Sequence, residues 1–256
     1  MSGHGRTGIG LGRPLVRLGE ATSTNDIGRL LAAVGAAEGA TVVADRQVLG
    51  RGRLGRSWES PAGGLWCSVL LRPPGSPSLA LLSLAASVAV AEAIEAAAGL
   101  RATLAWPNDV MVHERKAAGI LLEGAADALV VGVGVNVAVP PGALTPDVAS
   151  RAISLDAASG RPIERDAVLD VLLDRLGRWY AAWLAGDAGV IDVWRERDAL
   201  AGAPVVVTLP GEVLEGIAEG PDQDGALRVR LRDGRVRRVL AGDVLSAAAV
   251  TVRRSR

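Results

Sequence analysis

One loop of this chain combines glycine, arginine and tryptophan in a way that suits anion binding. Residues 50–58 read GRGRLGRSW, with three glycines, three arginines and no acidic residue. Glycine lets the backbone take a positive φ and approach a ligand closely, and the forked guanidinium of arginine suits phosphate or carboxylate. The indole of Trp58 can stack on a planar ring. The spacing is not that of a P-loop or a dinucleotide motif. The alternative is a solvated basic loop, whose unopposed charges would repel one another unless an anion binds.

A second candidate is Lys116, the only lysine among 28 basic residues. A lone lysine is by itself a weak signal, yet its compact ammonium is not interchangeable with a guanidinium. It lies in RKAAGI, residues 115–120, where Gly119 follows it by three positions. Residues 131–137, VGVGVNV, form a predicted strand with two glycines and one polar residue, Asn136. Glycine within a strand often marks the close approach of a ligand, so both segments are candidate walls of a site.

The composition is that of a folded chain with a sizeable core. Its 256 residues are 49% hydrophobic and 22% charged, and 28 basic residues balance 28 acidic ones. This balance excludes a disordered or disulfide-stapled protein and provides no global basic field for nucleic acid or an anionic membrane. The single cysteine, Cys67, excludes an internal disulfide, and two histidines argue against a Cys/His zinc site. We therefore expect a cytoplasmic location.

The elements that must position these residues alternate irregularly. Ser23-Thr24-Asn25 is typical of a helix N-cap, so we expect a helix over about 27–34. Valine-rich and apolar runs predict strands at 41–44, 65–71, 110–113, 118–123 and 129–139, and helices at 79–98, about 164–185 and 190–199. Several strands are linked as hairpins, which predicts an α+β fold on a mixed β-sheet. The helix at 79–98 has too short an apolar run to cross a bilayer, and we expect a buried core helix.

The ends of the chain have a different character. Residues 1–13 are rich in glycine and predict a loose tail; residues 14–201 form the main domain and residues 202–256 a second one. From residue 205 onward, short strands divided by turns predict a small barrel. Its Arg228, Arg230 and Arg232 alternate along a predicted strand and so share one face. The favoured interpretation is a solvated sheet edge, and the less favoured one is a phosphate-binding stripe.

Together the motifs resemble those of the biotin–protein ligases, specifically the biotin–[acetyl-CoA-carboxylase] ligases. The STN, GRGRLGRSW, WPND, RKAAGIL and GVGVNV segments occur in that order between residue 22 and residue 137. The resemblance implies the mixed-sheet domain shared with lipoyl ligases and related to class II aminoacyl-tRNA synthetases, followed by an SH3-like barrel. It implies that biotin and ATP form biotinyl-5′-adenylate with release of pyrophosphate. Biotin then passes to a lysine of a biotin carboxyl carrier domain of an acyl-CoA carboxylase.

The resemblance also implies a role for each matching residue. Lys116 and Arg51 match the catalytic cations. The positions that match biotin-binding residues are Ser23, Thr24, Asn25, Gln47, Arg51, Gly52, Arg53, Lys116 and Gly119. The nucleotide-side positions are Arg53, Trp58, Asn108 and Asn136, and Asp109 is a candidate Mg²⁺ ligand. An ammonium near the α-phosphate would offset the repulsion between a carboxylate and a triphosphate.

Departures from the family pattern leave some expectations open. Ala105 stands where the family usually has a lysine before WPND, and Ala117 replaces a leucine. Some members carry an N-terminal helix-turn-helix of about 60 residues; only about 13 residues precede the domain here, so we expect no repressor activity and no DNA partner. The alternatives are a lipoate or octanoate ligase and, less favoured, a non-catalytic biotin-binding or nucleic-acid-binding module. Exposed sheet edges allow a monomer or a homodimer.

Overall fold

The main domain is built on a seven-stranded mixed sheet. The computed structural model describes residues 9–75, 78–125 and 127–246. The strands run in the order β1-β2-β3-β7-β6-β5-β4, where only the β1–β2 pair is parallel. Their bounds are β1 (Leu15–Ala21), β2 (Thr41–Gln47), β3 (Leu65–Leu71), β4 (Thr103–Ala105), β5 (Asp109–Val112), β6 (Arg115–Ala125) and β7 (Ala128–Val135). This arrangement confirms the predicted α+β class.

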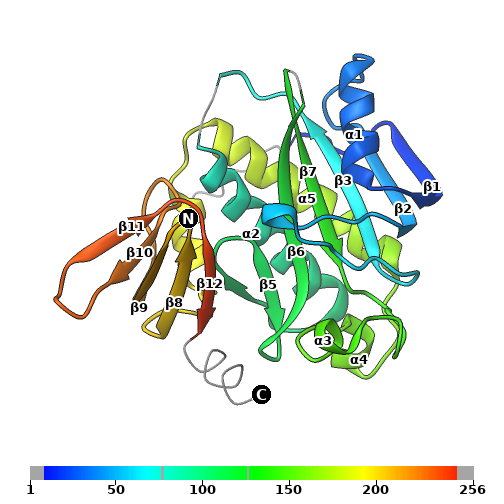
Figure 1. The fold of residues 1–256 in the computed structure, drawn as a ribbon. Coiled ribbons are helices and arrows are strands. Elements are labelled where there is room, and N and C mark those ends of the chain that lie inside the picture. Colours follow the sequence, from blue (N-terminus) through cyan, green and yellow to red (C-terminus); the bar gives the residue numbers. More distant parts are fainter. Residues whose placement is uncertain (1–8, 76–77, 126, 247–256) are drawn as a thin grey trace, which may run out of the picture.

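Two helices cover one face of this sheet. They are α2 (Leu79–Ala98) and α5 (Arg165–Leu184), which lie behind the strands in Figure 1. By length and composition alone α2 could span a membrane, but 61% of its most apolar window is buried inside the fold. It packs against α5 and β6, so its apolar residues belong to the main core, as the sequence predicted.

The helix α1 (Thr24–Ala33) lies on the opposite face, beside β3 and β7. Gly28 permits this packing, because a Cβ there would come within 2.9 Å of Val130. A second, smaller apolar cluster forms beneath the helix from Ala32, Ala40, Leu70, Ala128 and Val130. The helix α1 therefore covers part of the sheet face opposite α2 and α5, and the uncovered part of that face leaves space for a cavity beside the helix.

The C-terminal part is a five-stranded antiparallel sheet. Its order is β11-β10-β9-β8-β12, with β11 and β12 at the edges among the described residues, and it forms the small all-β unit that the sequence predicted. The bounds are β8 (Pro204–Leu209), β9 (Glu212–Pro221), β10 (Leu227–Arg230), β11 (Val236–Val239) and β12 (Asp243–Ser246). A buried bond from Trp106 Nε1 to the carbonyl of Gly225, 3.0 Å long, ties this sheet to the main domain. The boundary predicted at residues 201–202 stays a prediction, because one core cluster extends through both parts.

Three short helices complete the fold, and some predicted bounds need correction. They are α3 (Pro146–Ala149), α4 (Leu155–Ser159) and α6 (Gly189–Arg195). The helix predicted at 190–199 ends at Arg195 because Arg197 and Ala199 bond to the backbone of Leu104 instead. The strand predicted at 129–139 ends at Val135. The strand β1 was not predicted, since its charged and glycine residues break the apolar pattern at a sheet edge.

The described part of the predicted tail is not loose. Ile9 N donates to the carbonyl of Gly177 at 3.3 Å, and Gly12 N donates to that of Gly39 at 2.8 Å. Ile9 and Leu11 also pack against the main core. Residues 1–8 of the predicted tail, and residues 247–256 of the predicted second domain, lie outside the described residues.

Candidate active site

A cavity of about 300 Å³ opens on the α1 face of the main sheet. All the site residues predicted from the sequence line it, although they come from six separate segments of the chain. They are Ser23, Thr24, Asn25, Gln47, Arg51, Gly52, Arg53, Trp58, Asn108, Asp109, Lys116, Gly119 and Asn136. The structure therefore brings the whole predicted set together at one site.

Glycines of β6 and β7 form part of the cavity floor. Gly119 and Gly134 are partners in the β6–β7 ladder, and Trp58 lies over both. A Cβ on Gly134 would come within 2.7 Å of Trp58 Nε1, and one on Gly119 within 3.0 Å of its ring. The indole nitrogen is buried and has no hydrogen-bond partner among the described residues. The absence of side chains on the two glycines thus makes room for the flat indole ring of Trp58 against the strands.

One end of the cavity is lined by neutral hydrogen-bonding groups. Ser23 caps α1 by accepting from Asn25 N at 3.3 Å, which confirms its N-cap role. Thr24 N donates to Gln47 Oε1 at 2.7 Å, and Thr24 Oγ1 lies 3.1 Å from the same oxygen. Ser68 of β3 reaches both Thr24 Oγ1, at 2.7 Å, and Asn25 Oδ1, at 2.6 Å. Such a set of fixed neutral donors and acceptors suits a neutral polar ring system.

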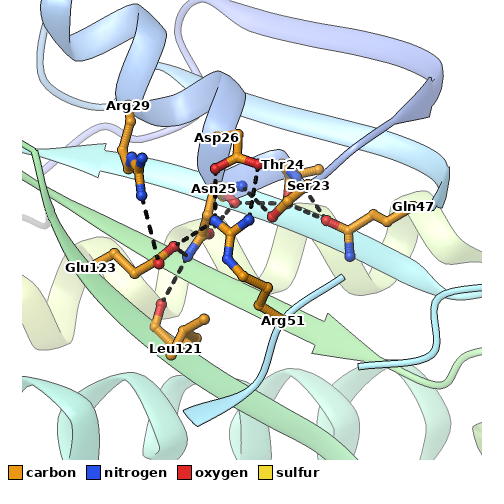
Figure 2. A network of polar contacts seen from close by, with 10 residues as sticks. Ser23, Thr24, Asn25, Asp26, Arg29, Gln47, Arg51, Leu121 and Glu123 are labelled. Atoms are coloured by element: carbon orange, nitrogen blue, oxygen red, sulfur yellow. Dashed lines mark hydrogen bonds and ion pairs between the residues drawn. The ribbon is translucent and has the colours of Figure 1, made fainter. Parts of the chain in front are cut away.

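The first arginine of the glycine-rich loop is held by two carboxylates (Figure 2). Arg51 binds Asp26 through both terminal nitrogens, at 2.9 and 2.7 Å, and lies 3.4 Å from Glu123 Oε2. The hydrogen bond from Arg51 holds the pKa of Asp26 below its usual range, and Asp26 raises the pKa of Arg51. Arg51 lines the cavity, and carboxylates of α1 and β6 balance its charge; its predicted role toward biotin and the phosphates stays a prediction.

The other two loop arginines reach the C-terminal sheet. Arg53 Nη1 lies 3.5 Å from Asn108 Oδ1 and 3.3 Å from the carbonyl of Gly242, and burial lowers the pKa of its guanidinium. Arg56 forms an ion pair with Asp243 of β12. The loop accordingly crosses from α1 to β12 over the cavity, and a short 3₁₀ turn, η1 (Arg53–Gly55), lies in its middle. Leu54 takes a φ of 56° there, which strains a residue with a Cβ.

Lys116 occupies the other end of the cavity. Its Nζ lies 2.6 Å from Asp109 Oδ1 and 4.9 Å from the centroid of the Trp58 ring. Asn136 Nδ2 donates to the carbonyl of Lys116 at 3.3 Å, and Asn108 Nδ2 donates to that of Ile120 at 2.7 Å. Both amides, expected on the nucleotide side, thus also hold the strand that carries the lysine.

Sequence reasoning missed several residues of the site. Ser68, Asp26 and Glu123 support its neutral end, while Leu144, Val148 and Arg151 line it near α3, and Asp243 lines it from β12. Asp26 directly follows the STN segment and could have been noticed. The others lie in segments without a distinguishing pattern, and only the fold brings them to the cavity.

Comparisons with known proteins agree with this geometry. Residues 21–139 match the model of the Biotin/lipoate A/B protein ligase family, and residues 201–245 match that of the Biotin protein ligase C terminal domain. A biotin–[acetyl-CoA-carboxylase] ligase of Paracoccus denitrificans is 37% identical over 84% of this chain and 93% of its own length. The chain belongs to the biotin protein ligase family. The resemblance inferred from the motifs is therefore confirmed.

Other members of the family support the same assignment. A biotin–[acetyl-CoA-carboxylase] ligase of Mycobacterium tuberculosis is 36% identical over 81% of this chain and 79% of its own length. The solved structure of the biotin protein ligase from Aquifex aeolicus in complex with biotin and ATP superposes with a TM-score of 0.81. It is 31% identical and covers 90% of this chain and 97% of its own. The similarity to biotin protein ligases thus extends through both sheets.

Proposed function

We propose that this chain is a biotin–[acetyl-CoA-carboxylase] ligase that works in two steps at the described cavity. In the first, a carboxylate oxygen of biotin attacks the α-phosphorus of ATP, and the bond to pyrophosphate breaks. In the second, the amine of a carrier lysine attacks the carbonyl of biotinyl-5′-adenylate. An amide forms, AMP leaves, and the amine loses a proton. The observation that carries this proposal is the convergence of all the matching motif residues on one cavity.

Biotin and the nucleotide occupy opposite ends of the cavity in this proposal. The neutral hydroxyl and amide groups of Ser23, Thr24, Asn25 and Gln47 suit the ureido ring of biotin. Lys116 and Arg53 supply cations at the other end, where the carboxylate and the α-phosphate must meet. One such contact in a site shielded from water is worth about 3–4 kcal/mol in the transition state. Closure of the glycine-rich loop keeps water from the reactive anhydride.

The residues of the site fit a magnesium ion that arrives with ATP. Among the described residues, no group of three or more His, Cys, Asp or Glu side chains could hold a metal by itself. Mg²⁺ is commonly held by one or two carboxylates together with substrate phosphates, and it neutralises their charge. Asp109, which lines the cavity and faces Lys116, is the carboxylate we assign to it.

We also propose the partners and the location of the enzyme. The partner is the carrier domain of an acyl-CoA carboxylase, and the location is the cytoplasm, where ATP is available and Cys67 stays reduced. DNA is not proposed as a partner, because the arginines of β10 and its following turn pair with nearby carboxylates: Arg228 and Arg230 with Glu219, and Arg232 with Glu215. The edge strand β1 allows pairing with a second copy of the chain, so a homodimer is the alternative to a monomer. Sedimentation distinguishes the two.

The deciding experiment measures pyrophosphate release from ATP by the purified protein with biotin, lipoate, octanoate or no acid. Release with biotin alone supports the proposal, and streptavidin blotting of an added carrier domain then tests the transfer step. Release with lipoate or octanoate but not biotin would assign the chain to the lipoyl branch of the fold. Binding of biotin without turnover would leave a binding protein.

A further inference from the structure

Glu123 connects two residues that line the cavity, although it is not itself a lining residue (Figure 2). Its Oε2 atom lies 2.6 Å from Asn25 Nδ2 and 3.4 Å from Arg51 Nη2. Asn25 belongs to the first turn of α1, Arg51 to the glycine-rich loop, and Glu123 to β6. One carboxylate oxygen therefore joins a helix, a loop and the sheet at the neutral end of the cavity.

The Asn25 amide has one permitted orientation. Its Oδ1 accepts from Ser68 Oγ at 2.6 Å, and its Nδ2 donates to Glu123. A Cβ on Gly132 would come within 2.3 Å of Asn25 Oδ1, so this glycine provides the space for the amide. Reversing the amide would place its oxygen against the Glu123 carboxylate, where no proton is available to bridge the two oxygens. Nδ2 also lies 3.5 Å from the carbonyl of Leu121, so Glu123 is the nearer of the two acceptors that make this side of Asn25 the donor.

The position of Arg51 depends on the same carboxylate. Asp26 holds its guanidinium from α1, and Glu123 holds it from β6. Glu123 is 23% exposed at its side chain, and Arg29 lies 3.9 Å from its other oxygen. Two carboxylates and two guanidiniums are therefore balanced beside the cavity. Because these four charges cancel, the groups that face a ligand are the neutral ones of Ser23, Thr24 and Gln47.

We propose that Glu123 is a positioning residue for biotin, and this inference rests on the proposed function. Glu123 acts through Asn25 and Arg51, which it holds in the arrangement that receives the neutral ring of biotin. Lys116 and Asp109 lie at the other end of the cavity and, among the described residues, form no hydrogen bond or ion pair with Glu123. Loss of Glu123 should therefore weaken binding of biotin and leave that of ATP nearly unchanged.

The test compares the wild type with Glu123→Gln, which keeps the shape but replaces one oxygen by an N–H donor. Calorimetry measures biotin binding without ATP, and pyrophosphate release gives kcat and both KM values. We expect the Kd and KM for biotin to rise about tenfold, while the KM for ATP and kcat change less than about threefold. The matched control is Glu215→Gln, an exposed glutamate on β9 that pairs with Arg232; its values should equal those of the wild type.

A swap of the two groups provides an independent arm. Asn25→Asp alone places two carboxylates in contact and should weaken biotin binding further. The double variant N25D/E123Q restores a hydrogen bond with its direction reversed. It should bind biotin about tenfold more tightly than Asn25→Asp alone. The double variant keeps both partners, so it also tests the inference if Glu123→Gln alone fails to fold.

Three results would overturn the inference. They are an unchanged biotin Kd in Glu123→Gln, an equal rise in the KM values for biotin and ATP, and the absence of rescue in the double variant. An equal rise would mean that Glu123 only stabilises the fold. A wild type that neither binds biotin nor releases pyrophosphate with it would overturn the proposed function, and the inference would fail with it. An active wild type with a normal Glu123→Gln variant would overturn the inference alone.

Discussion

Lys116 and Asp109 face each other from the adjacent strands β6 and β5, with Nζ 2.6 Å from Oδ1. A shift of register between Val110 and Met111 makes this possible, because Asp109 pairs with Gly119 while Met111 pairs with Lys116. In a regular strand, residues three apart point to opposite faces. The extra residue in β6 puts Lys116 and Gly119 on one face, so the ammonium and the glycine floor belong to the same cavity.

Replacement of Lys116 should abolish most of the first step. We expect biotin-dependent pyrophosphate release to fall by at least about 10²-fold in both Lys116→Ala and Lys116→Arg. The wider, forked guanidinium does not reproduce the compact charge that the ammonium places between Asp109 and the Trp58 ring. The control is Arg115→Lys, since the Arg115 side chain is exposed and, within the described part of the chain, donates only to the backbone of Ala149. Normal release by Lys116→Ala would remove Lys116 from the mechanism.

The two roles proposed for Asp109, holding Lys116 and binding magnesium, have different readouts in one variant. In Asp109→Asn we expect a rate about tenfold lower and a higher magnesium concentration for half-maximal pyrophosphate release. The rate falls because the Lys116 ammonium loses its ion pair, and the magnesium requirement rises because a carboxylate ligand is lost. Titration with MgCl₂ at saturating ATP measures both. An unchanged magnesium requirement would restrict Asp109 to holding Lys116.

The ion pair between Arg56 and Asp243 should restrain the glycine-rich loop. In Asp243→Asn we expect faster trypsin cleavage after the loop arginines, since Arg56 loses its partner on β12. Limited proteolysis followed by mass spectrometry identifies the cut. Asp233→Asn is the control, because Asp233 pairs with Arg235 in the turn between β10 and β11 and, among the described residues, forms no ion pair or hydrogen bond with the glycine-rich loop. Equal cleavage in the two variants would show that Asp243 does not hold the loop.

Cys67 should be inert in the folded protein. Burial raises the pKa of its thiol to about 12, from 9.0. The thiolate is the reactive form, so we expect no reaction with a thiol reagent at pH 8 until the chain unfolds. The thiol ionises at a lower pH in the unfolded chain than in the folded one. The free energy of unfolding therefore falls as pH rises above 9.0. The free energies of unfolding of the wild type and Cys67→Ala, measured by denaturant melts, should therefore converge between pH 9.0 and about 12. Parallel pH profiles would contradict this assignment.

Much of the fold could be predicted from local pattern. The buried helix at 79–98 and the strand at 65–71 were predicted with their observed bounds, because long apolar runs leave few alternatives. The edge strand Leu15–Ala21 was missed, since its charged and glycine residues interrupt the apolar pattern. The end of α6 was misplaced because pairing with Leu104, a long-range contact, overrides helix propensity.

The sequence by itself determined the family and the motif residues that line the cavity, because residue type and spacing in the glycine-rich loop, around Lys116 and around Asn136 are specific. It did not determine which way the side chains point. Only the tertiary structure decided that Arg51 faces Asp26 and Glu123, while Lys116 faces Asp109. Those contacts depend on strand register, on a bulge and on the packing of α1 against the sheet. Each of these joins residues far apart in the chain, and no local pattern encodes them.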